Sequence, residues 1–183
     1  MRLGLDRAPK LRSTLARALA ALAISTAIGL VSGPAAGAAN VGALNADERQ
    51  AIHWKINEAR SQGRNCGATR YAAAPLIPWN LSLEAAAQRH SNDMANRNFF
   101  SHTGSDGLTL GGRLRWAGYP YYNAAEDIAA GYTGIDTVVQ GWLDSPSHCV
   151  AIMNPALKEL GAARATNPAS QYGTYWTLDL AAR

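Results

Sequence analysis

The chain has 183 residues, with 17 Lys and Arg against 13 Asp and Glu. Residues 1–38 hold five of these bases and one of the acids, so the remaining 145 residues (183 less 38) carry 12 of each and no net charge. A chain of that size is long enough for one domain with a hydrophobic core. It lacks the basic stripe that nucleic-acid binding requires, so we expect no nucleic-acid partner.

The first 38 residues have the pattern of a secretory signal peptide. A basic start is followed by an apolar run, Ala18 to Val31, and by Ala36-Gly37-Ala38, which fits an A-x-A cleavage site. An uncleaved anchor helix is the alternative, but the run is shorter than the ~20 residues that a membrane span needs. We expect a signal peptide over 1–38, a linker over 39–45 and a single domain over 46–183, with no transmembrane span after cleavage. The expected location is secreted and extracellular, or the periplasm or cell envelope of a bacterium.

Apolar periodicity predicts helices over 46–62, from Asn80 or Ser82 to about Asn96, over 110–116 and over 135–143. The segments 63–78 and 98–108 are rich in Gly, Pro and polar residues and are expected to be loops. His90 shares an apolar stripe with its helix neighbours. We interpret it as a hydrogen-bonded core histidine rather than a ligand.

The end of the chain combines one more helix with strands. Ser145 can cap a helix with its side chain, proline suits the first helical position, and His148 follows in the first turn, where the helix dipole favours a neutral imidazole. Segments 124–130, 160–166 and 172–181 are expected to be extended, and the last alternates, with Trp176 and Leu178 on one face and Thr177 on the other. Strands after several helices predict an α+β domain with an antiparallel sheet.

The two cysteines, Cys66 and Cys149, both follow the signal segment. In an exported chain an even count indicates a disulfide, and only one pairing exists here. Two buried free thiols are the alternative. Because Cys149 is next to His148, a bridge would also fix the position of a candidate site residue.

Three segments place ionisable residues at element boundaries: F-F-S-H-T-G, A-E-D-I-A-A-G and W-L-D-S-P-S-H-C. They present His102, Glu126 and His148. Two imidazoles and a carboxylate in one cleft can bind a divalent cation or transfer protons. The sequence of each segment does not by itself show that the three side chains lie close together.

These segments, in their order and spacing, resemble the bacterial branch of the CAP superfamily, also called the SCP or cysteine-rich secretory protein family. The resemblance runs from about Asn57 to Leu180 and includes I-N-E-A-R, R-H-S-N-D-M-A, R-L-R-W-A-G-Y, I-M-N-P, E-L-G-A-A and Y-W-T-L-D-L. It implies a three-layer α-β-α sandwich with a central antiparallel sheet. It also implies an open cleft lined by two histidines and two acids, of which His102, Glu126 and His148 match three.

The chain departs from the family pattern at two positions. Ser145 stands where the family has its second acid, and the adjacent Asp144 is turned by about 100° on a helix, so it is not a simple replacement. Asp127 stands where the family usually has asparagine. The resemblance therefore implies a His-Glu-His triad, His102, Glu126 and His148, rather than a full tetrad.

Three functions are compatible with these residues. The first is a secreted, non-catalytic binding module for a lipid or sterol, a protein, or a divalent cation such as Zn²⁺ held by His102, His148 and Glu126. Alternatively, the same triad is only a hydrogen-bonded cluster that shapes the cleft. The second is a metal-dependent or general-base peptidase with Glu126 as base, although the chain has no H-E-x-x-H or G-x-S-x-G motif. The third is an envelope or host-surface interaction protein that uses the aromatic stretch from Trp116 to Tyr122.

Overall fold

The computed structural model describes residues 42–183, so the predicted signal peptide and the start of the predicted linker lie outside the described residues. The elements are α1 (Ala46–Ser61), β1 (Arg64–Cys66), β2 (Thr69–Tyr71), α2 (Leu81–Arg97), α3 (Leu110–Trp116), β3 (Asn123–Ala130), α4 (Ile135–Asp144), α5 (Pro146–Met153), β4 (Glu159–Thr166) and β5 (Thr174–Ala182). Within residues 42–183, no helix combines the length and the apolar character needed to cross a bilayer.

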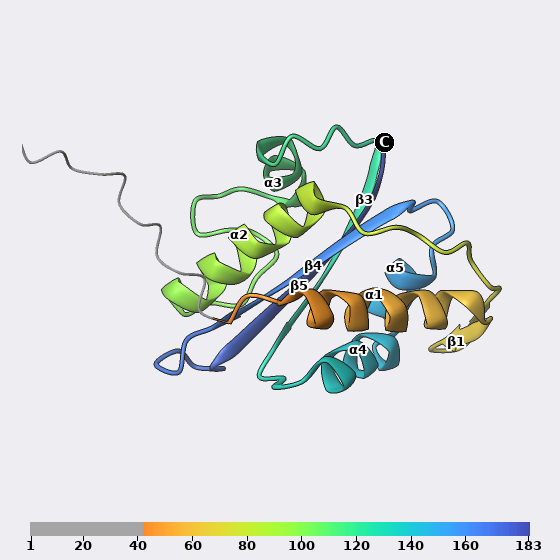
Figure 1. Cartoon of the computed structure of the whole chain (residues 1–183), viewed down its shortest axis with the longest axis horizontal. Coiled ribbons are helices and arrows are strands. Elements are labelled where there is room, and N and C mark those ends of the chain that lie inside the picture. Colours follow the sequence, from red (N-terminus) through yellow and green to blue (C-terminus); the bar gives the residue numbers. More distant parts are fainter. Residues whose placement is uncertain (1–41) are drawn as a thin grey trace, which may run out of the picture. The chain divides into compact units, whose positions relative to one another are not determined.

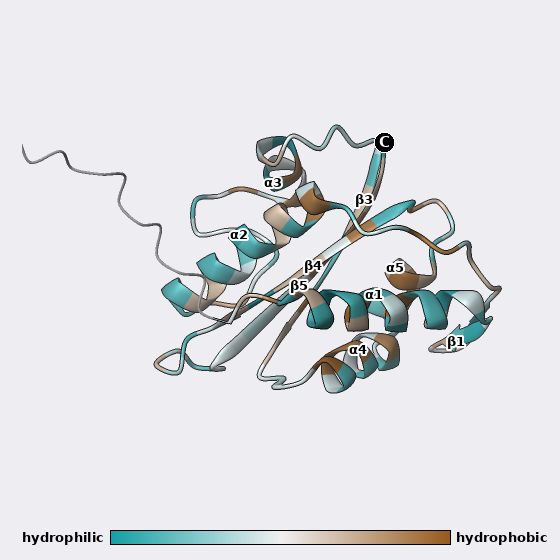
Figure 2. Ribbon diagram, viewed as in Figure 1, coloured by the Kyte–Doolittle hydropathy of each residue, from teal (hydrophilic) through white to brown (hydrophobic). Residues whose placement is uncertain are grey.

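The central sheet has three antiparallel strands in the order β3-β5-β4. Helices α2 and α3 cover one face of it, and α1, α4 and α5 cover the other (Figure 1). The predicted three-layer α-β-α sandwich is thereby confirmed. Figure 2 shows that α1 and α2 alternate between hydrophilic and hydrophobic residues along their length, as helices with one buried face do.

The alternation along β5 decides which side chains enter which layer. Trp176, Leu178 and Leu180 belong to the core beneath α1, α4 and α5, whereas Tyr175 and Ala181 pack on the α2 side. This is the period of two that the sequence predicted for the strand. The helices on the two faces of the sheet therefore pack on separate cores, and β5 contributes side chains to both.

Helix α2 packs closely on β4 because of one glycine. A Cβ atom on Gly161 would lie 2.2 Å from the main-chain nitrogen of Glu84, in the first turn of α2. Asn80 caps this helix, since its side chain accepts from the N–H groups of Ser82 and Leu83. The close approach sets α2, and with it His90, against the sheet.

Two local predictions were wrong. The segment 63–78 contains a hairpin, β1–β2, whose turn uses Gly67 at φ +62° and whose strands are only three residues long, too short for a periodic signal. Ser145 occupies the N-cap of α5 without a side-chain capping bond, and its carbonyl accepts from the N–H of Cys149 at 2.9 Å.

The predicted disulfide is present. Cys66 and Cys149 are bonded and their Cα atoms are 5.4 Å apart. The bond joins β1 to α5, the helix that carries His148 in its first turn. Both sulfurs lie in a small buried cluster with Met153, so the bridge is shielded from solvent.

Candidate functional site

Glu126, in the middle of β3, is the centre of a buried polar cluster. Its side chain is 3% exposed, and its Oε1 lies 2.8 Å from His102 Nδ1 and 4.0 Å from His90 Nε2. Its Oε2 accepts from the guanidinium of Arg113, which is also buried. Both carboxylate oxygens are therefore already engaged by neighbouring side chains.

Two buried side chains hold the loop that carries His102. The ring of His90 donates from Nε2 to the carbonyl of Ser101 at 2.9 Å. Arg113 Nη1 donates to the carbonyls of His102, at 3.1 Å, and Leu108, at 2.9 Å. The interpretation of His90 as a hydrogen-bonded core histidine is confirmed. These bonds tie the loop to two buried side chains.

The members of the cluster differ in the direction in which their pKa values are shifted. The hydrogen bond with Glu126 raises the pKa of His102, whose side chain is 60% exposed. Burial alone would raise the pKa of Glu126, but the bond with His102 and the charge of Arg113 outweigh it and lower that pKa. Burial lowers the pKa of His90. The pair His102–Glu126 is thus biased towards its charged form and His90 towards its neutral form.

Two further carboxyl groups lie beside Glu126. Asp179 is its direct partner across the sheet, and Asp127 follows it in β3 on the opposite face. In the described part of the chain, both oxygens of Asp179 and Oδ2 of Asp127 lack a hydrogen-bond partner. Burial, reinforced by the charge of Glu126, raises the pKa of each well above its usual range. A protonated Asp179 is able to donate a hydrogen bond to Glu126.

His148 stands apart from this cluster and lines an apolar pocket. The pocket has a volume of about 300 Å³. Its walls are formed by Phe100, Ile128, Ala129, Ala130, Tyr132, Gly141, Trp142, Ser145, His148 and Tyr172. Burial, and after it the charge of His102, lowers the pKa of His148, which favours the neutral imidazole. The charge of His102 therefore reaches His148, but of these two histidines only His148 lines the pocket.

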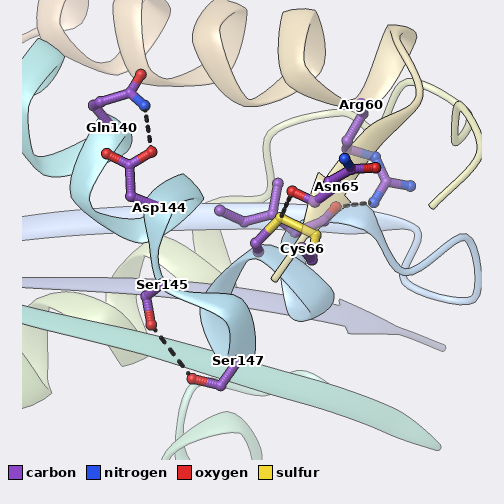
Figure 3. Close-up of a disulfide and its surroundings, with 9 residues drawn as sticks. Arg60, Asn65, Cys66, Gln140, Asp144, Ser145 and Ser147 are labelled. Atoms are coloured by element: carbon purple, nitrogen blue, oxygen red, sulfur yellow. Dashed lines mark hydrogen bonds between the residues drawn. A yellow bond between two sulfur atoms is a disulfide. The ribbon is translucent and has the colours of Figure 1, made fainter. Parts of the chain in front are cut away.

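The side chains of Asp144 and Ser145, beside and at the position of the missing acid, point in different directions. Asp144 accepts from Gln140 on its own helix at 2.7 Å, on the other side of the chain from Ser145 (Figure 3). Ser145 lines the pocket, with its hydroxyl 3.5 Å from that of Ser147. Asp144 is not among the residues that line the pocket. The pocket wall thus has a serine hydroxyl where the family pattern has a carboxylate.

The residues expected to hold a cation do not form a three-ligand site. Within residues 42–183, no group of three or more His, Cys, Asp and Glu side chains has an arrangement that could hold a metal ion. Glu126 is engaged by Arg113 and His102. Only the two imidazoles remain, whereas catalytic zinc sites generally have three protein ligands.

Sequence reasoning missed two members of the cluster. Arg113 lies in R-L-R-W-A-G-Y, which carried part of the resemblance, but its ion pair with Glu126 joins separate elements and leaves no local pattern. Asp179 lies on the α2 face of β5, the same face as Thr177, and is paired across the sheet with Glu126. A carboxyl group at a buried strand position is the signal that could have identified it.

The comparisons agree with this architecture. Residues 54–180 match the model of the CAP family, described as the cysteine-rich secretory protein family. The chain is 33% identical over 85 residues to the uncharacterized membrane protein YlbC of Bacillus subtilis (strain 168), over 46% of this chain and 25% of that protein. The chain thus spans about a quarter of the length of that relative.

Two solved structures share the fold. An extracellular protein containing an SCP domain from Bacillus anthracis str. Ames is 27% identical, with a TM-score of 0.62 over 83% of this chain and 45% of that chain. An outer surface protein from Borrelia burgdorferi has a TM-score of 0.64 over 77% of this chain and 97% of that chain, at 19% identity. At that identity the second likeness supports the fold alone.

Proposed function

Because the chain belongs to the cysteine-rich secretory protein (CAP) family, we propose that it is a secreted, non-catalytic module that binds an apolar group in the pocket beside His148. The observation that carries the proposal is the pocket itself, about 300 Å³ in volume and walled mainly by apolar and aromatic side chains with a few polar groups. Pockets of this size and lining are typical of ligand sites. The extracellular SCP-domain structure and the apolar segment after the basic start of the chain support export.

Contacts between wall residues and with buried neighbours hold the walls of the pocket in place. The rings of Phe100 and Tyr172 contact edge to face, with centroids 5.9 Å apart, and Tyr172 makes a second contact of this kind with the buried Tyr175. At Tyr132, another wall residue, the main-chain carbonyl accepts from the indole N–H of the buried Trp176 at 2.8 Å. A wall that is ordered in advance loses less conformational entropy when a ligand binds.

Catalysis by Glu126 fits this geometry poorly. A general base needs a free oxygen within reach of the proton that it removes. Both oxygens of Glu126 are engaged, and its lowered pKa weakens it as a base. No free thiol is found among the described residues, because Cys66 and Cys149 are bonded. We expect Glu126→Gln and the wild-type protein to give the same background in a peptidase assay.

The test is binding of the apolar dye 1-anilinonaphthalene-8-sulfonate to the protein lacking residues 1–38, followed by fluorescence. We expect one saturable site that weakens about ten-fold in Phe100→Ala, since Phe100 is 44% exposed in the free protein and a ligand would cover it. Fully burying an aromatic side chain contributes on the order of 1.5–3 kcal/mol. Ser145→Trp should block the site by filling it. Tyr122→Ser is the matched control, because Tyr122 is exposed and lies outside the pocket. Equal binding in all four proteins would reject the proposal.

A further inference from the structure

The central sheet has two outer edges, and one of them is closed. On β4, the N–H of Leu160 donates to Pro78 and its carbonyl accepts from Asn80, at 3.0 Å and 2.7 Å. Further along, the side-chain amide of Gln88 donates to the carbonyl of Arg164 at 2.9 Å. The main-chain groups that β4 directs away from the sheet therefore have partners at these positions.

The edge formed by β3 is different. The N–H of Gly131 donates to the carbonyl of Thr174 on the β5 side at 2.9 Å. In an antiparallel ladder alternate residues direct both main-chain groups to the same neighbour, so Ala129 also faces β5, while Ile128 and Ala130 face outward. Within residues 42–183 we find no hydrogen-bond partner for the outward groups of these two residues. Unpaired groups of this kind are a template for another strand.

The apolar pocket opens on this same stretch. Ile128, Ala129 and Ala130 form part of its wall, so a molecule in the pocket lies against the main chain of β3. Phe100 and Tyr172 bound the same pocket. One site thus combines two outward-facing residues of an edge strand with an aromatic pocket. Peptide recognition by strand addition uses this combination, in which main-chain bonds give affinity and a side-chain pocket gives specificity.

We propose that the open edge of β3 binds a short extended peptide segment of a partner protein, paired with the main chain of Ile128 and Ala130, with one large apolar side chain in the pocket. This inference rests on the proposed function of the pocket and names the class of its ligand. The two outward-facing residues provide hydrogen bonds for about three residues of an added strand.

Size argues for a short segment rather than a second copy of this chain. A stable interface between folded proteins needs about 800 Å² per partner. The part of the edge that adjoins the pocket consists of the two outward-facing residues that flank Ala129, and the pocket holds about 300 Å³. A site of this size suits one large side chain and the peptide groups on either side of it.

The charges along this edge narrow the class of peptide further. Glu126, the carboxylate next along this edge, is already paired with Arg113 and contacts His102, so a basic peptide side chain would find no free acid there. A neutral or acidic peptide is the better complement.

The experiment uses an array of fluorescein-labelled heptapeptides with threonine at alternate positions, in which the central residue and the residue two positions before it vary over all amino acids. We expect binding, measured by polarisation, to be strongest with a central Phe, Trp or Leu, and stronger with Asp than with Lys at the second position. N-methylation of the peptide groups beside the central residue should weaken binding about ten-fold, because it removes the main-chain bonds.

The protein variants separate strand pairing from simple pocket filling. Ala130→Pro removes an outward-facing N–H and no bond to β5, and it should weaken peptide binding about ten-fold. Ala124→Pro is the matched control, because the same alternation directs Ala124 outward at the other end of β3, away from the pocket. Melting temperatures of both variants establish that they are folded, and the N-methylated peptides test the same point on the unaltered protein.

Three results would overturn the inference. The first is an array in which no peptide binds tighter than about 1 mM. The second is equal binding of the N-methylated and parent peptides, and the third is equal binding by Ala130→Pro and Ala124→Pro. If the dye still binds in a manner sensitive to Phe100→Ala, the proposed function stands and strand pairing alone is rejected. If neither dye nor peptide binds, both are rejected.

Discussion

The two faces of the central sheet use different chemistry. The face under α1, α4 and α5 is an apolar core that includes Trp176 and Leu178. The face under α2 and α3 buries charged and polar groups, among them Arg113 and Asp179, around Glu126. The first face stabilises the fold by burial, and the second fixes the loop that carries His102. A mutation on the first face should therefore change stability without affecting His102, whereas a mutation on the second should change both.

The largest expected effect is that of Arg113→Ala, because it leaves the buried carboxylate of Glu126 without its cation. We expect the free energy of unfolding to fall by about 3–5 kcal/mol, measured by urea denaturation. Leu178→Ala on the opposite face should cost a comparable amount, about 2–5 kcal/mol. Only the first should change the pKa of His102. The comparison between the faces fails if both variants change that pKa equally.

Asp127 is the exception on the apolar face, and Asp127→Asn should stabilise the protein by about 0.5–2 kcal/mol at pH 7. Because burial raises the pKa of Asp127, the folded state binds a proton more tightly than the unfolded state. Stability from this group is therefore present below the unfolded pKa, about 3.9, and is lost as the pH rises through the folded pKa. The advantage of Asp127→Asn should shrink towards pH 4. An advantage in melting temperature that stays constant between pH 7 and pH 4 would contradict the raised pKa of Asp127.

Zinc calorimetry tests the expectation of a cation at His102 and His148. Two imidazoles should bind zinc much more weakly than structural sites do, for which the apparent free energy is about 10–16 kcal/mol. Restoring the acid of the family pattern with Ser145→Glu should tighten binding about ten-fold. The His102→Ala/His148→Ala double variant is the control. Equal heat from the control and the wild type would show that these histidines hold no cation.

The smallest effect concerns protonation and is measured by NMR titration of the imidazoles. His102 should titrate above its usual pKa, and His90 and His148 below theirs. Glu126→Gln should lower the pKa of His102, because it replaces the carboxylate acceptor and leaves the positive charge of Arg113 nearby. A His102 pKa that does not move in this variant would mean that the hydrogen bond has no electrostatic consequence.

The sequence predicted most of the long elements because periodicity is a local signal. The end of α1 and the start of α2 were predicted within a residue or two, and the alternation of β5 was correct over Trp176 to Leu180. The hairpin β1–β2 was missed because its strands are too short to show a period. The long-range contact of Arg113 with Glu126 was missed for a different reason. It depends on the packing of α3 against β3, which no local pattern encodes.

One consequence follows from the disulfide. Cys66 and Cys149 are 83 residues apart in the chain, and the turn of the hairpin at Gly67 lies against Pro146, one residue after Ser145 in the pocket wall. On the chain-entropy argument, closing a loop of this length contributes about 4–5 kcal/mol. The bond therefore makes the start of α5, and the pocket wall built on it, dependent on an oxidation step. In a reducing compartment we expect the sheet and its polar cluster to keep their non-covalent contacts while that wall loses its tether, so that oxidation of the two thiols would set how well the proposed pocket holds a ligand.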